Sequence, residues 1–127
     1  MDSSITYRQR VPVSDEALQA LGKQPWPRLP QVLARSFTWI TAYEGDRLIG
    51  FVNVAWDGDV HYFLLDTVVH PDYRHRGIGS RLVREAIDAG RGHGGWLHVD
   101  SDEALMRDFY GPCGFEPTPA GLVSLSG

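Results

Sequence analysis

The residues best suited to chemistry in this sequence lie in the stretch HPDYRHRGIGSRLVREAI, residues 70–87. Gly77 and Gly79 stand where an apolar run gives way to a helical pattern, with arginines on both sides. The first turn of a helix has unpaired N–H groups and a partial positive charge, and glycine lets an anion approach the backbone closely. Arginine adds donors that match phosphate oxygens. The stretch therefore predicts a site for a phosphate-bearing cofactor.

Two common phosphate-binding motifs do not fit this stretch. The chain has no G-x-x-x-x-G-K-[ST] string, and Leu82 stands where the dinucleotide motif G-x-G-x-x-G needs its third glycine. Residues 72–84 hold four Arg and one Asp, a local charge of +3, whereas the whole chain has a formal net charge of -4. One basic spot on an acidic chain favours a single anionic ligand over nucleic acid.

Length and composition predict one ordinary domain over residues 1–127. The chain is 43% hydrophobic and 22% charged, as is typical of globular proteins. Its single cysteine excludes an internal disulfide, and no His/Cys spacing resembles a zinc site, so we expect no metal. We also expect a cytoplasmic protein without membrane contact, because no apolar run approaches roughly 20 residues and the N-terminus has no leader pattern.

The elements that must position the basic stretch follow from the hydrophobic pattern. Helical patterns begin after Ser14 and end at Gly22, and they recur over residues 77–90 and over residues 101–110, where Ser101 is the expected cap. One or two more helical turns are expected before residue 37. Runs of β-branched and aromatic residues predict strands at residues 5–11, 37–43, 47–56, 60–69, 94–100, 114–117 and 121–126.

The run at residues 60–69 is apolar on both faces, which predicts a central strand covered on each side. The helix over residues 77–90 has the right length for a crossover, so the strand that follows it should run parallel to the strand before it. Short connections earlier in the chain predict antiparallel neighbours. The fold class is therefore α/β, with a mixed sheet of the α+β kind.

Two motifs resemble signatures of one protein family, the GNAT superfamily of N-acetyltransferases. Residues 74–79 read RHRGIG and match the family's acyl-CoA signature R/Q-x-x-G-x-G/A, and residues 109–115 read FYGPCGF, which is similar to FYxxxGF. The resemblance covers roughly residues 37–118. It implies a GNAT-like sheet of about six to seven strands with about four helices. It also implies acetyl-CoA as the donor and a primary amine of a small molecule or peptide as the acceptor, and it allows a homodimer.

The same resemblance implies roles for individual residues. Val68 and Val69 match the positions where the fourth strand bulges, parts from the fifth and holds the pantetheine arm and the thioester carbonyl. Tyr110 matches the tyrosine that gives a proton to the departing thiolate, a role open to a phenol that is protonated at neutral pH. The alternative is that Tyr110 only packs beneath the cofactor. The pyrophosphate would be held by the amides of Arg76, Gly77, Ile78, Gly79 and Ser80, with Arg74 and His75 nearby.

The sequence does not decide which residue acts as the general base. Leu65 stands where many family members carry a glutamate. Asp66 follows it in an apolar run, where an unpaired carboxylate is costly to bury, so Asp66 must have a partner or face the cleft. A purely structural Asp66, a basic His98, a water relay and an acyl-enzyme on Cys113 are the alternatives. Glu103 replaces an asparagine that some members place near the pantetheine.

The acceptor is also left open by the sequence. Acidic residues such as Asp57 and Asp102 are compatible with a cationic amine, although each has an ordinary role in a turn or a helix cap. A polyamine-like, amino-sugar or amino-acid acceptor is favoured over a large protein. The alternative functions are an acyl-CoA-binding module without turnover and a protein-interaction domain that only retains the fold.

Overall fold

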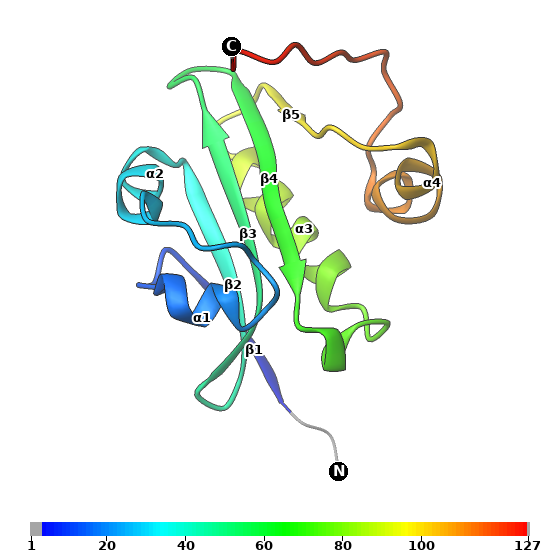
Figure 1. Ribbon diagram of the computed structural model, residues 1–127. Helices are drawn as coiled ribbons and strands as arrows, with labels where there is room; N and C mark the ends of the chain where they lie inside the picture. Colours follow the sequence, from blue (N-terminus) through cyan, green and yellow to red (C-terminus); the bar gives the residue numbers. More distant parts are fainter. Residues whose placement is uncertain (1–3, 127) are drawn as a thin grey trace.

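The strand-forming runs of the sequence pair into one five-stranded sheet in a computed structural model, which describes residues 4–126 (Figure 1). The order of the strands in the sheet is the same as their order in the chain. The first four are antiparallel to their neighbours, and the last is parallel to the fourth, so the predicted mixed sheet is confirmed. The strands are β1 (Ile5–Gln9), β2 (Thr38–Glu44), β3 (Arg47–Trp56), β4 (His61–Val69) and β5 (Trp96–His98).

Helices cover the two faces of this sheet (Figure 1). On one face α3 (Ile78–Arg91) buries the apolar side of its helix beneath β2, β3 and β4. On the other face α1 (Asp15–Gln19) and α2 (Leu29–Arg35) pack on Trp39 and Phe51. No helix within residues 4–126 is long and apolar enough to cross a membrane. The remaining short helices are η1 (Pro71–Tyr73), α4 (Glu103–Leu105), η2 (Met106–Tyr110) and η3 (Gly111–Cys113).

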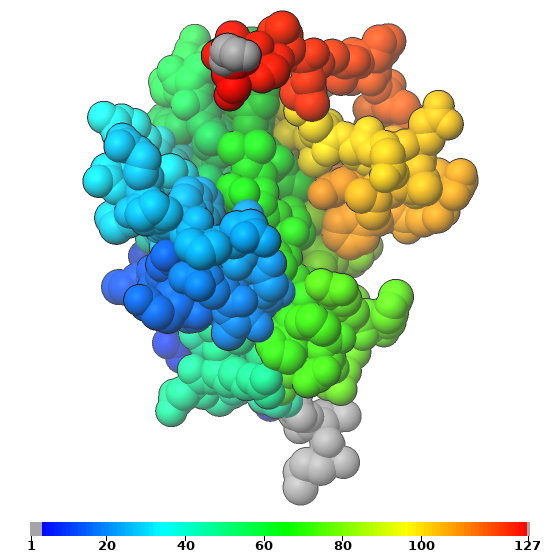
Figure 2. Space-filling model, viewed as in Figure 1, coloured from blue at the N-terminus to red at the C-terminus, as the bar shows by residue number. Residues whose placement is uncertain are grey.

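The sheet has fewer strands than the six to seven expected, because residues 114–117 and 121–126 form no strand. Pro117 and Pro119 have no backbone N–H to donate to a ladder. The segment after them lies exposed along one end of the molecule, where it is drawn in red (Figure 2). The domain predicted over residues 1–127 stays a prediction, and residues 1–3 and 127 lie outside the described range.

Two predicted boundaries differ from the observed ones for local reasons. The first strand ends at Gln9 and not at residue 11, because Arg10 takes a left-handed φ of 59° that interrupts extended backbone. Helix α4 is capped by Asp102 and not by Ser101: its carboxylate accepts a hydrogen bond from the amide of Leu105 at 2.7 Å. An ionised carboxylate is also the stronger partner for the positive end of a helix.

The first half of β4 is covered on one face only. Tyr62 and Leu64 are buried beneath α3, whereas Phe63 and Leu65 on the opposite face are 42% and 43% exposed. Helices α1 and α2 pack over β2 and β3 and leave this part of β4 open. The prediction of a central strand covered on both sides is therefore wrong for this segment, and the open face lies beside the candidate site.

Candidate active site

Strand β4 carries a bulge at Asp66 and Thr67. Leu65 pairs with Asn53 of β3, and Val68 pairs with Phe51, so β4 holds one more residue than β3 between these pairs. Asp66 has a φ of 61°, a left-handed conformation that is uncommon for a residue with a side chain. The bulge that the family resemblance implies in the fourth strand is therefore present, but it lies at Asp66 and Thr67, just before the expected Val68 and Val69.

Strands β4 and β5 separate next to this bulge. Strand β5 pairs with β4 only from His61 to Phe63, whereas β4 continues to Val69. The edge of β4 beyond Phe63 has no partner in β5, and Val68 and Val69 lie in this part. The carbonyl of Val69 accepts a hydrogen bond from Nε of Arg74 at 3.2 Å, which ties the end of β4 to the basic loop that follows.

The basic loop ends in an uncapped helix N-terminus. Gly77 is the N-cap of α3, with a left-handed φ of 79° and no side-chain capping bond. The first bond of the helix runs from the Arg81 amide to the Gly77 carbonyl at 3.0 Å, so Ile78, Gly79 and Ser80 have amides without an acceptor in the helix. Free amides at the positive end of a helix fit a phosphate, and hence the diphosphate of coenzyme A.

The charged residues of this loop lie on the surface. Arg74, His75 and Arg76 are all exposed. The Arg76 guanidinium lies 5.0 Å from the ring centre of Tyr73, and His75 holds a left-handed φ of 64°. Strained backbone of this kind costs about 1–3 kcal/mol and is found often at ligand sites. The loop therefore combines positive charge, strained backbone and unpaired amides.

Gly79 has a packing role that sequence reasoning missed. A Cβ atom at Gly79 would lie 3.3 Å from the ring of Phe109, tighter than most real contacts. The glycine therefore lets η2 approach the start of α3. A larger residue at position 79 would push Phe109 aside, so its effect would report on this packing and not only on an anion held by the loop.

Tyr110 closes η2, a five-residue π-helix, and π-turns inside helices occur often at functional sites. Its ring is 9% exposed and packs edge-on against Phe109 and Phe115. Burial raises the pKa of Tyr110 above its ordinary value of 10.0, although a side-chain hydrogen bond with Thr67 opposes the shift. The phenol is thus protonated at neutral pH, and Thr67, whose side chain acts on its pKa, belongs to the bulge of β4.

The position of Asp66 in an apolar run requires that it has a partner or faces a cleft, and the structure shows both. Its carboxylate accepts a hydrogen bond from Nζ of Lys23 at 2.9 Å, and it lines a cleft. The same ammonium group lies 5.1 Å from the ring centre of Trp26. Lys23 is the only lysine of the chain and is 43 residues away from Asp66, so no local pattern could have predicted the pair.

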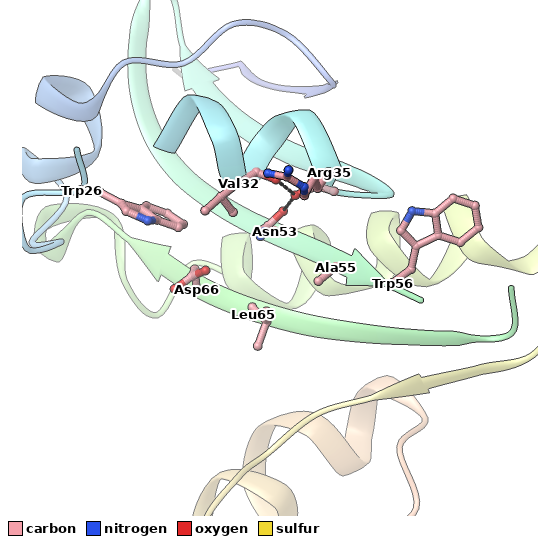
Figure 3. A pocket seen from close by; sticks show the side chains of 9 residues that line it. Trp26, Val32, Arg35, Asn53, Ala55, Trp56, Leu65 and Asp66 are labelled. Atoms are coloured by element: carbon pink, nitrogen blue, oxygen red, sulfur yellow. Dashed lines mark hydrogen bonds between the residues drawn. The ribbon is translucent and has the colours of Figure 1, made fainter. Parts of the chain in front are cut away.

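The cleft lies between α2 and β4 on the face of the sheet opposite α3 (Figure 3). Its volume of ≈ 420 Å³ is of the order found for small-molecule sites. It adjoins the bulge, because Leu65 and Asp66 are part of its lining. The lining consists of Trp26, Val32, Arg35, Ser36, Asn53, Ala55, Trp56, Leu65 and Asp66.

Polar residues of this lining, among them Asn53 and Arg35, were not singled out from the sequence. Asn53 is 0% exposed, and within residues 4–126 its amide nitrogen has no hydrogen-bond partner. A buried donor without a partner costs about 1–3 kcal/mol, so it calls for an explanation. A polar residue within the apolar run FVNVA was a signal for Asn53. Arg35, in the last turn of α2, gave no such signal.

The other candidate bases and nucleophiles lie away from the cleft. The ring of His98 stacks on Phe63, and its Nε2 lies 3.0 Å from Nδ1 of His61. Cys113 lines a different hollow, beside α3. Neither residue contributes to the lining of the cleft. Of the candidates from the sequence, the structure brings Asp66 and Tyr110 to the bulge of β4.

Comparisons with known proteins agree with this arrangement. The model of the acetyltransferase (GNAT) family matches residues 6–115. N-alpha-acetyltransferase RimI of Mycobacterium tuberculosis is 31% identical over 109 residues, which are 80% of this chain and 68% of that protein. Mycothiol acetyltransferase of Mycolicibacterium vanbaalenii is 35% identical over 94 residues, 73% of this chain but only 28% of that protein. The chain thus spans less than a third of the mycothiol acetyltransferases it matches.

A solved structure shows the same fold along nearly the whole chain. A GNAT family acetyltransferase from Streptococcus pneumoniae is 27% identical and superimposes with a TM-score of 0.78, covering 96% of this chain and 99% of its own. The region matched by the family model contains the bulged strand, the basic loop and Tyr110. The chain belongs to the GNAT family of acetyltransferases.

Proposed function

We propose that this chain is an N-acetyltransferase that moves an acetyl group from acetyl-CoA to a primary amine of a small molecule or peptide, by direct attack in a ternary complex. One observation carries the proposal: the edge of β4 that β5 leaves open, next to the bulge, leads into the start of α3, where three amides have no acceptor in the helix. The size of the adjoining cleft supports a small acceptor over a folded protein.

The donor would bind along the end of β4 and the start of α3. Acetyl-CoA supplies an acetyl group activated as a thioester. The backbone at Val68 and Val69 would hold its pantetheine arm, and Arg74 and His75 would add charge beside the phosphates. The diphosphate would accept hydrogen bonds from the amides of residues 76–80, which the geometry of the α3 N-terminus supports.

The chain's own residues contribute orientation and a proton. Once the amine has lost its ammonium proton, its nitrogen bonds to the carbonyl carbon, and the carbon–sulfur bond breaks. The sulfur takes the Tyr110 proton, and the second proton of the nitrogen returns through water to the Tyr110 phenolate, which leaves an acetamide, a free thiol and the restored phenol. Holding the two reactants in line supplies about 7–11 kcal/mol, and general acid help adds about 10²–10⁴ in rate.

Asp66 is our candidate for the residue that binds the acceptor amine and takes its proton. Its carboxylate lies in the cleft beside the bulge and already binds one primary ammonium, that of Lys23. We assign it to holding the ammonium of the acceptor and to receiving its proton directly or through water. The same ion pair also favours the second candidate function, an acyl-CoA-binding module, because Lys23 occupies the carboxylate and Leu65 replaces the family's glutamate.

A Tyr110→Phe variant tests the proposal. With acetyl-CoA and a panel of amines, we expect kcat to fall by about 10²–10⁴ while CoA affinity is retained, because only the acid is lost. Release of the CoA thiol and calorimetric titration with CoA measure the two quantities. Tyr62→Phe is the matched control, since Tyr62 is a buried tyrosine whose hydroxyl bonds the Asp59 carbonyl.

Two results would contradict the proposal. An unchanged kcat in the Tyr110→Phe variant would show that Tyr110 is not the general acid. Tight CoA binding without turnover of any amine in the panel would show the binding module instead.

A further inference from the structure

The cleft beside β4 has one wall that consists of hydrogen-bond donors. Asn53 is completely buried, and within residues 4–126 its Nδ2 atom has no partner. Figure 3 shows Asn53 on β3 extending into the same hollow as Asp66 on β4. Both N–H groups of this amide are thus left for a molecule in the cleft.

The distance to Ser36 fixes which end of the Asn53 amide faces the cleft. The Ser36 hydroxyl lies 2.6 Å from Oδ1 of Asn53 and 3.0 Å from the Val32 carbonyl, and its single proton serves the shorter contact. A separation this short is normal between two oxygens and shorter than the range of about 2.7–3.2 Å between nitrogen and oxygen. The oxygen of the amide is therefore the atom held by Ser36, and the nitrogen faces the cleft.

Arg35 adds a positive charge to the same wall. It ends α2 and lines the cleft, and it takes part in no ion pair within the described part of the chain. A guanidinium group is a donor only, with a planar set of N–H groups that matches a carboxylate. Asn53 and Arg35 thus offer donors and no acceptor, which suits an anionic oxygen group.

The other wall has the opposite character. Asp66 accepts hydrogen bonds there and already binds the ammonium of Lys23. Between the two walls the lining is apolar, with Val32, Ala55 and Leu65. Figure 3 shows Trp26 and Trp56 at opposite ends of the hollow. A molecule that fills this cleft should therefore carry an ammonium group for Asp66, an anionic oxygen group for Asn53 and Arg35, and an apolar part for the rest of the lining.

We propose that the acceptor is an amine that also carries a carboxylate, with the carboxylate bound by Asn53 and Arg35 and the ammonium held by Asp66. The inference rests on the proposed function. A polyamine has no oxygen for the donors. Acidic residues that favoured a cationic acceptor have other partners: the carboxylate of Asp57 accepts from the amides of Asp59 and His61, and Asp102 caps α4.

Three probes that differ in one group test the proposal. They are L-phenylalanine, its carboxamide L-phenylalaninamide, and 2-phenylethylamine, which lacks the carboxylate. Binding to the CoA-loaded protein is followed by ¹H–¹⁵N NMR through the side-chain amide of Asn53, identified by its loss in the Asn53→Leu variant. Phenylalanine should move this signal and bind about tenfold or more tightly than the other two, because a hydrogen bond to a charged group is a strong one.

Variants of Arg35 and Asn53, the hydrogen-bond donors of the cleft, make the test more specific. Arg35→Gln and Asn53→Asp should each weaken phenylalanine binding by about tenfold and leave 2-phenylethylamine unchanged. Arg28→Gln is the control for charge, because Arg28 is an exposed arginine at the start of the helix that Arg35 ends and does not line the cleft. Thr38→Val is the control for burial, since Thr38 has the other unpaired buried polar atom and also lies outside the lining.

Failure of this inference differs from failure of the proposed function. Equal binding of the three probes, or a preference for 2-phenylethylamine, would overturn the carboxylate site, even if amines without a carboxylate are acetylated. An Asn53 signal that does not move when phenylalanine binds would also overturn it. Loss of all turnover with the binding preference intact would refute the proposed enzyme and leave the carboxylate site standing.

Discussion

The basic loop proposed for the phosphates and the cleft proposed for the acceptor both adjoin β4, and they are built in different ways. The loop, residues 74–80, is contiguous, and its binding groups are backbone amides at the start of one helix. The cleft collects side chains from the segment before α2, from α2 itself, and from β3 and β4. We therefore expect donor binding to depend on local backbone geometry and acceptor binding to depend on tertiary packing.

The largest effect expected on CoA affinity comes from breaking the backbone geometry of the loop. Gly77→Ala places a side chain at a left-handed φ of 79°, at a cost of about 1–2 kcal/mol. If the loop relaxes to avoid this strain, the amides of α3 turn away, and CoA affinity falls roughly five- to thirtyfold. Calorimetric titration with CoA measures the loss.

Gly22→Ala is the matched control for this change. Gly22 also has a positive φ, 106°, and a Cβ there would meet open space, as at Gly77. Both variants should lower the melting temperature, but only Gly77→Ala should weaken CoA binding. Equal CoA affinity in the two variants would contradict the assigned loop.

A smaller effect is expected from the side chains of the loop. Arg76→Ala removes one exposed guanidinium beside the amides, and we expect CoA affinity to fall about fivefold, as for a charge-assisted bond at an exposed site. The difference should shrink as salt rises, because the Debye length falls from about 10 Å at 0.1 M to about 3 Å at 1 M. Fluorescence competition at both salt concentrations measures it.

Arg91→Ala is the control for Arg76→Ala, because Arg91 lies at the opposite end of the same helix. It should leave CoA affinity unchanged at either salt concentration. An equal loss in both variants would mean that the net charge of the protein matters and not its position at the loop.

In the cleft, we expect the contributions of Lys23 and Asp66 to stability to be coupled. The two side chains are only 24% and 27% exposed and 2.9 Å apart, so their interaction is less screened than that of a surface pair. We expect a coupling free energy of about 1 kcal/mol from the variants Lys23→Met, Asp66→Asn and the double variant. Urea unfolding measures it, and a value near zero would show that the pair does not fix the cleft.

The smallest effect concerns the pH dependence of stability. The pKa of Tyr110 is raised by burial, so its contribution to stability is complete below the unfolded value of 10.0 and is lost as pH rises through the folded value. Between pH of about 8 and 11, wild type should therefore lose more unfolding free energy than Tyr110→Phe. Part of the loss should persist in the variant, because burial also raises the pKa of Tyr7.

The contrast between the two regions also explains what the sequence could predict. The loop, the helix at residues 77–90 and Tyr110 are carried by short contiguous motifs, and the structure has α3 at Ile78–Arg91. The contact of Lys23 with Asp66 and that of Gly79 with Phe109 depend on how distant segments pack. The two strands predicted at residues 114–117 and 121–126 are absent from the structure. An alternating apolar segment forms a strand only if it finds an edge to pair with.

The central claim is that the free amides at the start of α3 bind the diphosphate of coenzyme A. Titration of the ¹⁵N-labelled protein with CoA, followed through the backbone amides, tests it most directly. We expect the largest chemical-shift changes at residues 76–80. Pantetheine, which has no phosphate, should not reproduce them. Shifts that avoid these residues, or that pantetheine produces equally, would contradict it.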